Sequence, residues 1–191
     1  MRCIKYFPLI IFSCLFSSLL CSCSSHRFPN FASEDQETKI KEPVKDFFYY
    51  AARLPQNINT YGKKVVLIDP NVHAWGAYDV DGKIVQAGLT SAGADWCFDI
   101  GRPCHTKSGT FRVYSLGSPD CKSTIFPIPE GGAPMPYCMY FNKGQALHGV
   151  HEGEVVEGNV SHGCVRLHIP DAYWLRYNFV DIGTKVIVRP Y

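Results

Sequence analysis

A cysteine beside two histidine–glycine pairs is the feature of this chain best suited to covalent chemistry. The stretch Ala146–Leu167 reads ALHGVHEGEVVEGNVSHGCVRL and contains His148, His162 and Cys164. The thiolate is the attacking form of cysteine, so a catalytic cysteine needs a base or a positive environment that lowers its pKa. Both histidines are candidate bases for Cys164, and His162 shares a face with it if the chain is extended. The stretch therefore predicts a thiol nucleophile activated by histidine.

Two glycines beside these residues indicate that the backbone approaches a ligand closely. Gly149 follows His148, and Gly163 precedes Cys164. Glycine adopts dihedrals that other residues avoid and leaves room for a ligand against the main chain. We therefore place Gly149 among the substrate-binding residues. We expect the N–H groups of Gly163 and Cys164 to face the oxyanion that forms when a thiolate attacks a carbonyl.

The segment SHGCVRL, together with the upstream His148-Gly149 pair, resembles the signature of the L,D-transpeptidase catalytic domain, also called the YkuD-like family. In that signature a His-Gly pair and a short insertion containing glycine precede Ser/Thr-His-Gly-Cys, and an Arg or Asn follows two residues after the cysteine. The matching residues are Ser161, His162, Gly163, Cys164 and Arg166. The resemblance extends from about Lys64 to Tyr191. A weaker likeness covers Thr106–Phe111, where Lys107 replaces the usual proline of a Thr-Pro-x-Gly-x-Phe run.

The resemblance implies that Cys164 is the nucleophile and His148 the proton acceptor and donor. A backbone carbonyl near Gly149 is expected to fix the tautomer of His148. It also implies a β-sandwich-like domain with the cysteine in a cleft. No cofactor or metal is expected.

Four further residues are assigned to the same site with less specific roles. Ser161 is expected to hold the turn through a bond between its hydroxyl and the backbone. For His162 three roles stay open, since it could shape the oxyanion turn, assist the thiolate or simply pack. Tyr137 is placed as a phenolic donor from a facing loop. Arg166 has two open interpretations, which are bidentate binding of a substrate carboxylate and an ion pair with an acid such as Asp171.

The N-terminal residues have the pattern of an export signal. Arg2 and Lys5 are followed by a mainly apolar run from Phe7 to Leu20. Leu20-Cys21-Ser22-Cys23 resembles a bacterial lipoprotein processing box with Cys23 as the lipidated residue, and the alternative is an ordinary signal peptide. We expect a lipoprotein-type signal peptide at residues 1–23, a flexible tether at 24–42 and the catalytic domain at 43–191. The predicted location is the periplasm or cell envelope, with membrane attachment through the lipid.

The cysteines outside the leader fit an oxidising compartment. The chain has nine cysteines. With Cys164 set aside as the nucleophile, Cys97, Cys104, Cys121 and Cys138 form an even set that allows three pairings. The pairs Cys97–Cys104 and Cys121–Cys138 close the shortest loops and are favoured. No C-x-x-C pair supports zinc binding by this set. A weaker hypothesis is zinc held by His148, His162 and Cys164.

Alternating and β-branched apolar runs predict a mainly β protein. The hairpin turn signals are Asp81-Gly82 and Asn142-Lys143-Gly144. The predicted strands are Val65–Asp69, Trp75–Val80, Lys83–Leu89, Thr110–Leu116, Cys138–Phe141, Gln145–Gly149 and Lys185–Arg189. Short helices are predicted at Pro43–Leu54 and Pro170–Tyr177. Because no strand–helix–strand alternation is visible, we predict a two-sheet, mainly antiparallel β-sandwich-like fold with one or two short helices.

The small net charge of +2 and the lack of a basic tract give no support to a nucleic-acid partner. The resemblance implies peptidoglycan stem peptides as substrates. The implied reaction is cleavage before the terminal D-Ala of a tetrapeptide stem through a Cys164 acyl-enzyme, followed by transfer to an amine. Two alternatives stay open, which are an L,D-carboxypeptidase that uses water and a non-catalytic module that binds the cell envelope.

Overall fold

The strand predicted at Val65–Asp69 is present with those bounds as β1, and all of its residues are buried. The computed structural model describes residues 44–191. The predicted signal peptide, the Cys23 lipidation site and the tether at 24–42 lie outside the described residues. β1 is buried on both faces because a second sheet packs on one side of it and a helix packs on the other.

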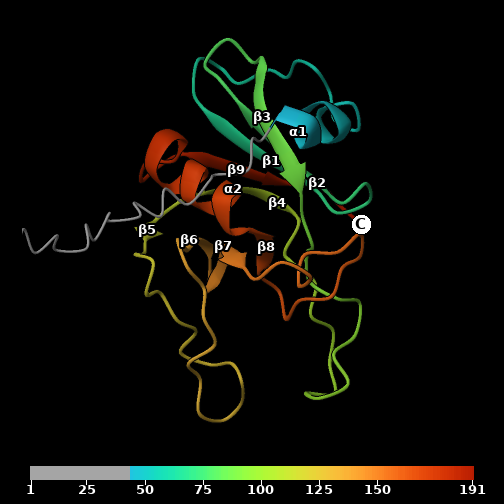
Figure 1. Ribbon diagram of the computed structural model, residues 1–191, viewed down its shortest axis with the longest axis vertical. Helices are drawn as coiled ribbons and strands as arrows, with labels where there is room; N and C mark the ends of the chain where they lie inside the picture. The colour runs from blue at the N-terminus through green and yellow to red at the C-terminus, as the bar shows by residue number, and fades with distance from the viewer. Residues whose placement is uncertain (1–43) are drawn as a thin grey trace, which may run out of the picture. The chain divides into compact units, whose positions relative to one another are not determined.

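Within the described residues the strands form two sheets (Figure 1). The five-stranded sheet has the order β3-β2-β1-β9-β4 and the four-stranded sheet has the order β5-β6-β7-β8. The strands are β1 (Val65–Asp69), β2 (Ala74–Tyr78), β3 (Ile84–Leu89), β4 (Gly109–Arg112), β5 (Ser115–Leu116), β6 (Met139–Asn142), β7 (Gln145–Val150), β8 (Val165–His168) and β9 (Lys185–Val188). The helical segments are α1 (Val44–Ala51), α2 (Ile169–Trp174) and the π-helical turn η1 (Leu175–Phe179).

The predicted fold class is confirmed, and most strand pairs are antiparallel. The exceptions are the parallel pairs β1–β9 and β7–β8. The two predicted hairpins join β2 to β3 and β6 to β7. Gly82 and Gly144 both have positive φ angles, +85° and +88°, which glycine adopts without steric cost. The hairpin turn at residues 142–144 therefore delivers β7 and its histidine to the middle of the smaller sheet.

The main core lies between the two sheets. Val66 and Ile68 of β1 face it from the larger sheet, and Leu147 of β7 and Leu167 of β8 face it from the smaller one. The alternate residues of β1, Val65 and Leu67, point the other way and form a second cluster that includes Ala51 of α1. This alternation follows from the two-residue repeat of a strand. The same alternation in β7 and β8 directs Leu147 and Leu167 into the core and leaves the opposite face of these two strands available for a site.

The structure divides one predicted strand and adds one strand that was not predicted. The predicted strand Thr110–Leu116 is divided, because β4 pairs with β9 in the larger sheet and β5 pairs with β6 in the smaller sheet. Val113 lies at the crossing, where it is buried and its N–H donates to the Thr184 carbonyl at 2.9 Å. The strand β8 was not predicted. Its four residues pair in parallel with β7, and that partner is set by tertiary structure.

Both predicted helices are present, with bounds that differ from the prediction. α1 lies within the predicted range Pro43–Leu54, and the C-terminal prediction is divided into α2 and η1. No helix among the described residues is long and apolar enough to cross a membrane.

Two long loops leave the sheets on the side of β5–β8, and in Figure 1 they extend below that sheet. Each contains one disulfide, Cys97–Cys104 in the loop between β3 and β4 and Cys121–Cys138 between β5 and β6. These are the pairs that the shortest-loop argument favours. Cys164 is the free cysteine of the described residues. The loops carry exposed apolar side chains, among them Phe98 and Ile125.

Candidate active site

The side chains of Cys164, His148 and Arg166 lie on one face of the parallel pair β7–β8. His148 of β7 is in register with Arg166 of β8, and Cys164 directly precedes β8. Side chains that are paired in register point to the same face, and alternate residues of a strand do so as well. Leu147 and Val165 occupy the opposite face in the core. The register of two strands therefore brings the predicted nucleophile and the predicted base together.

This face borders a cleft of about 570 Å³. Its walls come from the hairpin turn at residues 143–145, the two disulfide-containing loops and the turn before β8. The residues of the predicted site that line it are His148, Ser161, His162, Gly163, Cys164 and Arg166. The cleft therefore unites most of the residues predicted from the sequence.

His148 is held as a neutral imidazole with one defined tautomer. Its side chain is buried, and its Nδ1 donates to the Gly149 carbonyl at 2.9 Å. A carbonyl only accepts, so the proton is on Nδ1 and the Nε2 lone pair is available as a base. The pKa of His148 is lowered to about 4, mainly by burial, with the Gly149 bond opposing the shift and the charge of Arg166 adding to it. At neutral pH the ring is therefore ready to accept a proton.

Cys164 is held as a neutral thiol. Its Sγ donates to the Gly144 carbonyl at 3.9 Å. Burial raises the pKa of the thiol, while a hydrogen bond from the Ala146 backbone and the charge of Arg166 act in the other direction. Because burial disfavours both the thiolate and the imidazolium, a resting ion pair between Cys164 and His148 is unfavourable.

The turn before β8 is closed by the hydroxyl of Ser161, as predicted. Ser161 is buried, and its Oγ donates to the Cys164 carbonyl and accepts the Gly163 N–H at 3.0 Å. The Gly163 N–H, which was predicted to face an oxyanion, thus has the Ser161 hydroxyl as its partner in this turn. Gly163 itself has a φ of +119°, a conformation that L side chains rarely adopt.

The Cys164 N–H is the group of this turn that stays available. The Gly163 carbonyl accepts the Thr106 hydroxyl at 2.9 Å, and Ser161 takes the Gly163 N–H and the Cys164 carbonyl. No hydrogen bond within the described part of the chain has the Cys164 N–H as its donor. A donor directly beside the nucleophile is suited to an oxyanion.

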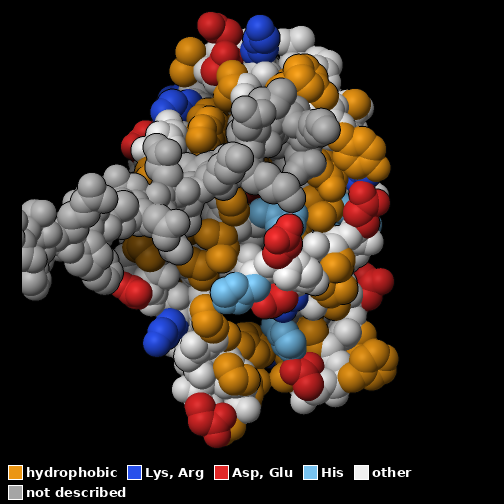
Figure 2. Space-filling view, viewed as in Figure 1, with side chains coloured by type: hydrophobic (Ala, Val, Ile, Leu, Met, Phe, Trp, Pro, Cys, Tyr) orange, Lys and Arg blue, Asp and Glu red, His pale blue; other side chains and the backbone are white. Residues whose placement is uncertain are grey.

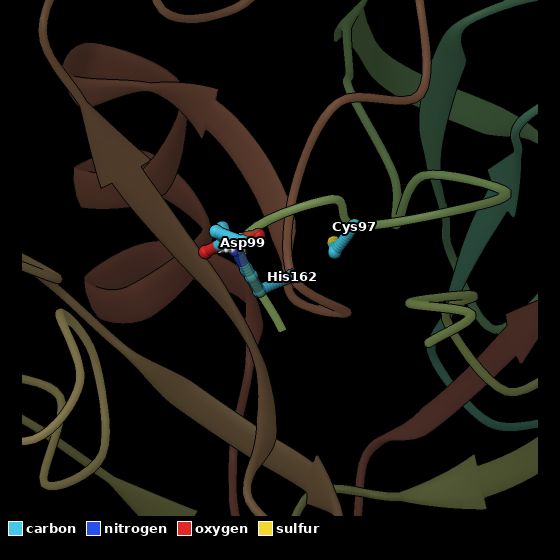
Figure 3. A group of neighbouring side chains, drawn as sticks. All are labelled: Cys97, Asp99 and His162. Atoms are coloured by element: carbon cyan, nitrogen blue, oxygen red, sulfur yellow. Dashed lines mark hydrogen bonds and ion pairs between the residues drawn. The ribbon is translucent and has the colours of Figure 1, made fainter. Parts of the chain in front are cut away.

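His162 contacts both disulfide-containing loops. Its Nε2 donates to Asp99 Oδ2 at 2.7 Å, and its ring lies 4.6 Å from that of Phe126. Figure 3 shows the Asp99 carboxylate against the His162 ring, with Cys97 to one side. The bond from His162 lowers the pKa of Asp99. Of the three roles left open for His162, these contacts favour packing and support of the turn.

The structure does not bring together the zinc ligands of the weaker hypothesis. Among the described residues, the group of potential ligand atoms within 4.8 Å of one another is that of Cys97, Asp99 and His162. The Cys97 sulfur is bonded to Cys104, so it is not a thiolate ligand. His148 and Cys164 do not belong to this group.

Two predicted substrate-binding residues have other surroundings. The Gly149 N–H donates to the Pro136 carbonyl at 2.8 Å, and a Cβ at Gly149 would lie 3.1 Å from Ile169 Cγ1, so this glycine allows α2 to pack on β7. Tyr137 does not line the cleft, and its ring packs against those of Tyr173 and Tyr177 at 5.4 and 5.8 Å. Neither position supports a direct contact with substrate.

Arg166 lies at the cleft, as carboxylate binding requires. The contact of its guanidinium is with the Glu154 carbonyl, with Nη1 at 3.5 Å from the oxygen. A bond of that length leaves most of the five donors of the group available to a ligand.

A sequence model of the L,D-transpeptidase catalytic domain matches residues 63–188. The chain belongs to this family. Among solved structures, an L,D-transpeptidase from Xylanimonas cellulosilytica is 27% identical with a TM-score of 0.60, and the match covers 72% of this chain and 66% of that one. L,D-transpeptidase 3 from Mycobacterium tuberculosis, in complex with a faropenem-derived adduct, is 25% identical with a TM-score of 0.54 and coverages of 66% and 60%.

An L,D-transpeptidase from Mycobacterium smegmatis, 24% identical with a TM-score of 0.54, shares the fold, with coverages of 67% and 59%. The chain thus spans less than two thirds of the length of these solved structures. No curated protein matches it significantly. L,D-transpeptidases act on the peptide stems of peptidoglycan and are associated with the cell envelope.

The candidate site also contains residues to which the sequence analysis gave no role. His151, Glu154 and Tyr140 line the cleft, and Thr106 lies beneath the catalytic turn. Figure 2 shows histidine and acidic side chains close together on the face that is viewed. For Thr106 the weak likeness to the Thr-Pro-x-Gly-x-Phe run was the available signal.

Proposed function

We propose that this protein is a cysteine-dependent peptidoglycan L,D-transpeptidase. The observation that carries the proposal is the placement of Cys164 and His148 on one sheet face at a cleft, with the Nδ1 proton of His148 bound to Gly149 so that Nε2 can act as the base. A neutral buried imidazole on the same sheet face as a protonated thiol suits general-base activation of a nucleophile at neutral pH.

The reaction begins when a tetrapeptide stem enters the cleft. His148 Nε2 takes the thiol proton as Cys164 Sγ attacks the carbonyl of the third residue, and the Cys164 N–H donates to the resulting oxyanion. Collapse breaks the bond to the terminal D-Ala, whose nitrogen receives the proton from His148. The product of this half-reaction is a thioester on Cys164 and free D-Ala.

The second half-reaction resolves the thioester. An acceptor amine attacks its carbonyl, His148 takes a proton from the amine, and the Cys164 thiol is restored. Arg166, at the edge of the cleft, suits the carboxylates of the stem peptide. An amine acceptor produces a cross-link or attaches another molecule to the stem. Water in place of the amine would make the enzyme an L,D-carboxypeptidase.

Mass spectrometry of the protein after mixing with a tetrapeptide-stem muropeptide tests the proposal. We expect an acyl adduct on Cys164 with release of D-Ala, and a cross-linked dimer when a second stem is added. A Cys164→Ala variant is the control for the nucleophile. The ratio of dimer to trimmed tripeptide distinguishes transfer from hydrolysis.

A folded protein that forms neither adduct nor product would refute the enzymatic proposal. Tight binding to cell-wall sacculi together with an unreactive Cys164 would then favour the envelope-binding module. Measuring both properties on the same preparation keeps these outcomes separate.

We also propose that residues 1–23 direct export, that Cys23 carries the lipid and that residues 24–42 tether the domain to the membrane. The support is the processing-box pattern Leu20-Cys21-Ser22-Cys23 and the apolar run before it. Metabolic labelling with a fatty acid should mark the wild-type chain but not a Cys23→Ser variant. Equal labelling of both would contradict this assignment.

A further inference from the structure

A buried threonine hydroxyl connects the first disulfide-containing loop to the turn that carries the nucleophile. Thr106 is 1% exposed. Its Oγ1 donates to the Gly163 carbonyl and accepts the Gly93 N–H, both at 2.9 Å. The hydroxyl has one proton, and that proton is used on Gly163.

The Gly163 carbonyl belongs to the same peptide group as the Cys164 N–H. A trans peptide is planar, and its carbonyl and N–H point in opposite directions. A hydrogen bond that fixes the oxygen therefore fixes the direction of the N–H on the other side. Ser161 restrains the neighbouring groups, so the Gly163–Cys164 peptide is held from both ends.

The part of the chain that presents Thr106 is itself firmly anchored. The Thr106 N–H donates to the Tyr191 hydroxyl at 2.8 Å, which in turn donates to the Gly93 carbonyl at 2.8 Å. A Cβ on Gly93 would lie 2.0 Å from the Cys104 carbonyl oxygen, so these segments are in close contact. The Cys97–Cys104 disulfide closes the same loop. Thr106 is thus a fixed point from which the catalytic turn is oriented.

We propose that Thr106 is a positioning residue for acyl transfer, whose hydroxyl aims the Cys164 N–H at the oxyanion by holding the Gly163 carbonyl. The inference rests on the proposed thiol acyl transfer and adds a residue from outside the catalytic sequence. If the inference is right, loss of the Thr106 hydroxyl slows the steps that form a tetrahedral oxyanion. Other reactions of the Cys164 thiol keep their rates.

Two reactions of the full chain separate these effects. In the first, p-nitrophenyl acetate acylates Cys164, so that an S–C bond forms, the ester C–O bond breaks and p-nitrophenolate leaves after a tetrahedral oxyanion. In the second, iodoacetamide alkylates Cys164 by direct displacement of iodide, with no oxyanion. The Cys164→Ala background is subtracted from the first, and the second is measured on the tryptic peptide that contains Cys164.

In Thr106→Val we expect acylation to slow by about 10- to 100-fold, at or below the loss caused by removing an oxyanion donor outright. Alkylation should stay within about twofold of the wild type, since displacement of iodide needs no such donor. Equal loss of both rates, or loss of neither, would overturn the proposal.

Thr90→Val is the matched control. Thr90 is also buried, and its Oγ1 donates at 3.0 Å to the carbonyl of Arg166, two residues after the nucleophile. Its loss removes a comparable hydrogen bond without touching the Gly163–Cys164 peptide, so both rates should stay near those of the wild type. A selective loss of acylation in Thr90→Val would overturn the assignment to Thr106.

Thr106→Val leaves two buried backbone groups without a partner and could fail to fold. If Thr106→Val does not fold, Thr106→Ser is the deciding variant. It keeps the hydroxyl, so its Cys164 should be acylated at a rate within about threefold of the wild type. Selective loss of acylation in this variant would refute the role of the hydroxyl. The ester probe needs no stem peptide, so failure on muropeptides would count against the proposed substrate and leave this test intact.

Discussion

Acidification should destabilise this protein through the buried base of its site. His148 is 5% exposed and its pKa is about 4, against an ordinary value of 6.5. The unfolded chain therefore binds a proton at a higher pH than the folded one does, and stability rises with pH wherever the unfolded state holds more protons. The contribution of His148 is complete above pH 6.5 and is lost as the pH falls towards 4.

The size of the effect follows from the two pKa values. Each pKa unit corresponds to about 1.4 kcal/mol, so the full difference amounts to about 3 kcal/mol. At pH 5, where most carboxylates are still ionised, His148 alone should lower the free energy of unfolding by about 2 kcal/mol relative to pH 7.5. That is a substantial part of the stability of an ordinary domain.

Urea unfolding of the wild type and His148→Gln at these two pH values isolates the contribution. Fluorescence of the buried Trp75 reports unfolding. We expect the wild type to lose about 2 kcal/mol more than the variant on acidification. His151→Gln, which removes an exposed histidine of the same cleft, is the matched control and should follow the wild type. If His148→Gln loses as much stability as the wild type, the buried neutral imidazole is not the cause.

Three further substitutions test the site. Gly163→Ala forces a side chain into a φ of +119°, so it should lower the free energy of unfolding in urea by about 1–3 kcal/mol and slow the acylation of Cys164. An unchanged urea midpoint would contradict the strain argument. Ser161→Ala leaves the Gly163 N–H without its partner and should cost about 1–3 kcal/mol by the same measurement, whereas a stability equal to that of the wild type would show that the hydroxyl does not hold the turn. Arg166→Gln removes a charge that lowers the pKa of Cys164, so the pH profile of alkylation by iodoacetamide should move to higher pH, and an unmoved profile would refute this influence of Arg166.

Local sequence signals were enough for the strands that carry their own pattern. Val65–Asp69 is an apolar run with β-branched residues, and its bounds were predicted correctly. The turn at Asn142-Lys143-Gly144 placed the hairpin that delivers His148. The family signature around Cys164 then identified the fold, because it fixes residues whose positions depend on a particular pair of strands.

The features that were missed depend on partners distant in sequence. β8 has only four residues, and it is a strand because it pairs in parallel with β7. Tyr137 has a φ of +61°, and its ring packs against those of Tyr173 and Tyr177, which lie 36 and 40 residues further along the chain. Thr106 donates to the carbonyl of Gly163, 57 residues further along the chain, and the weak likeness of Thr106–Phe111 to a family run does not indicate that partner.

The contacts of His162 have a consequence for how the family's sequences should vary. Asp99 from one disulfide-containing loop and Phe126 from the other both depend on this one ring, which lies two residues before the nucleophile. Replacement of the histidine would remove a donor from the acid and a surface from the aromatic ring at the same time. Because His162 belongs to the family signature, we expect Asp99 and Phe126 to be kept or lost together among related chains, as a correlated pair, while other exposed loop residues vary independently.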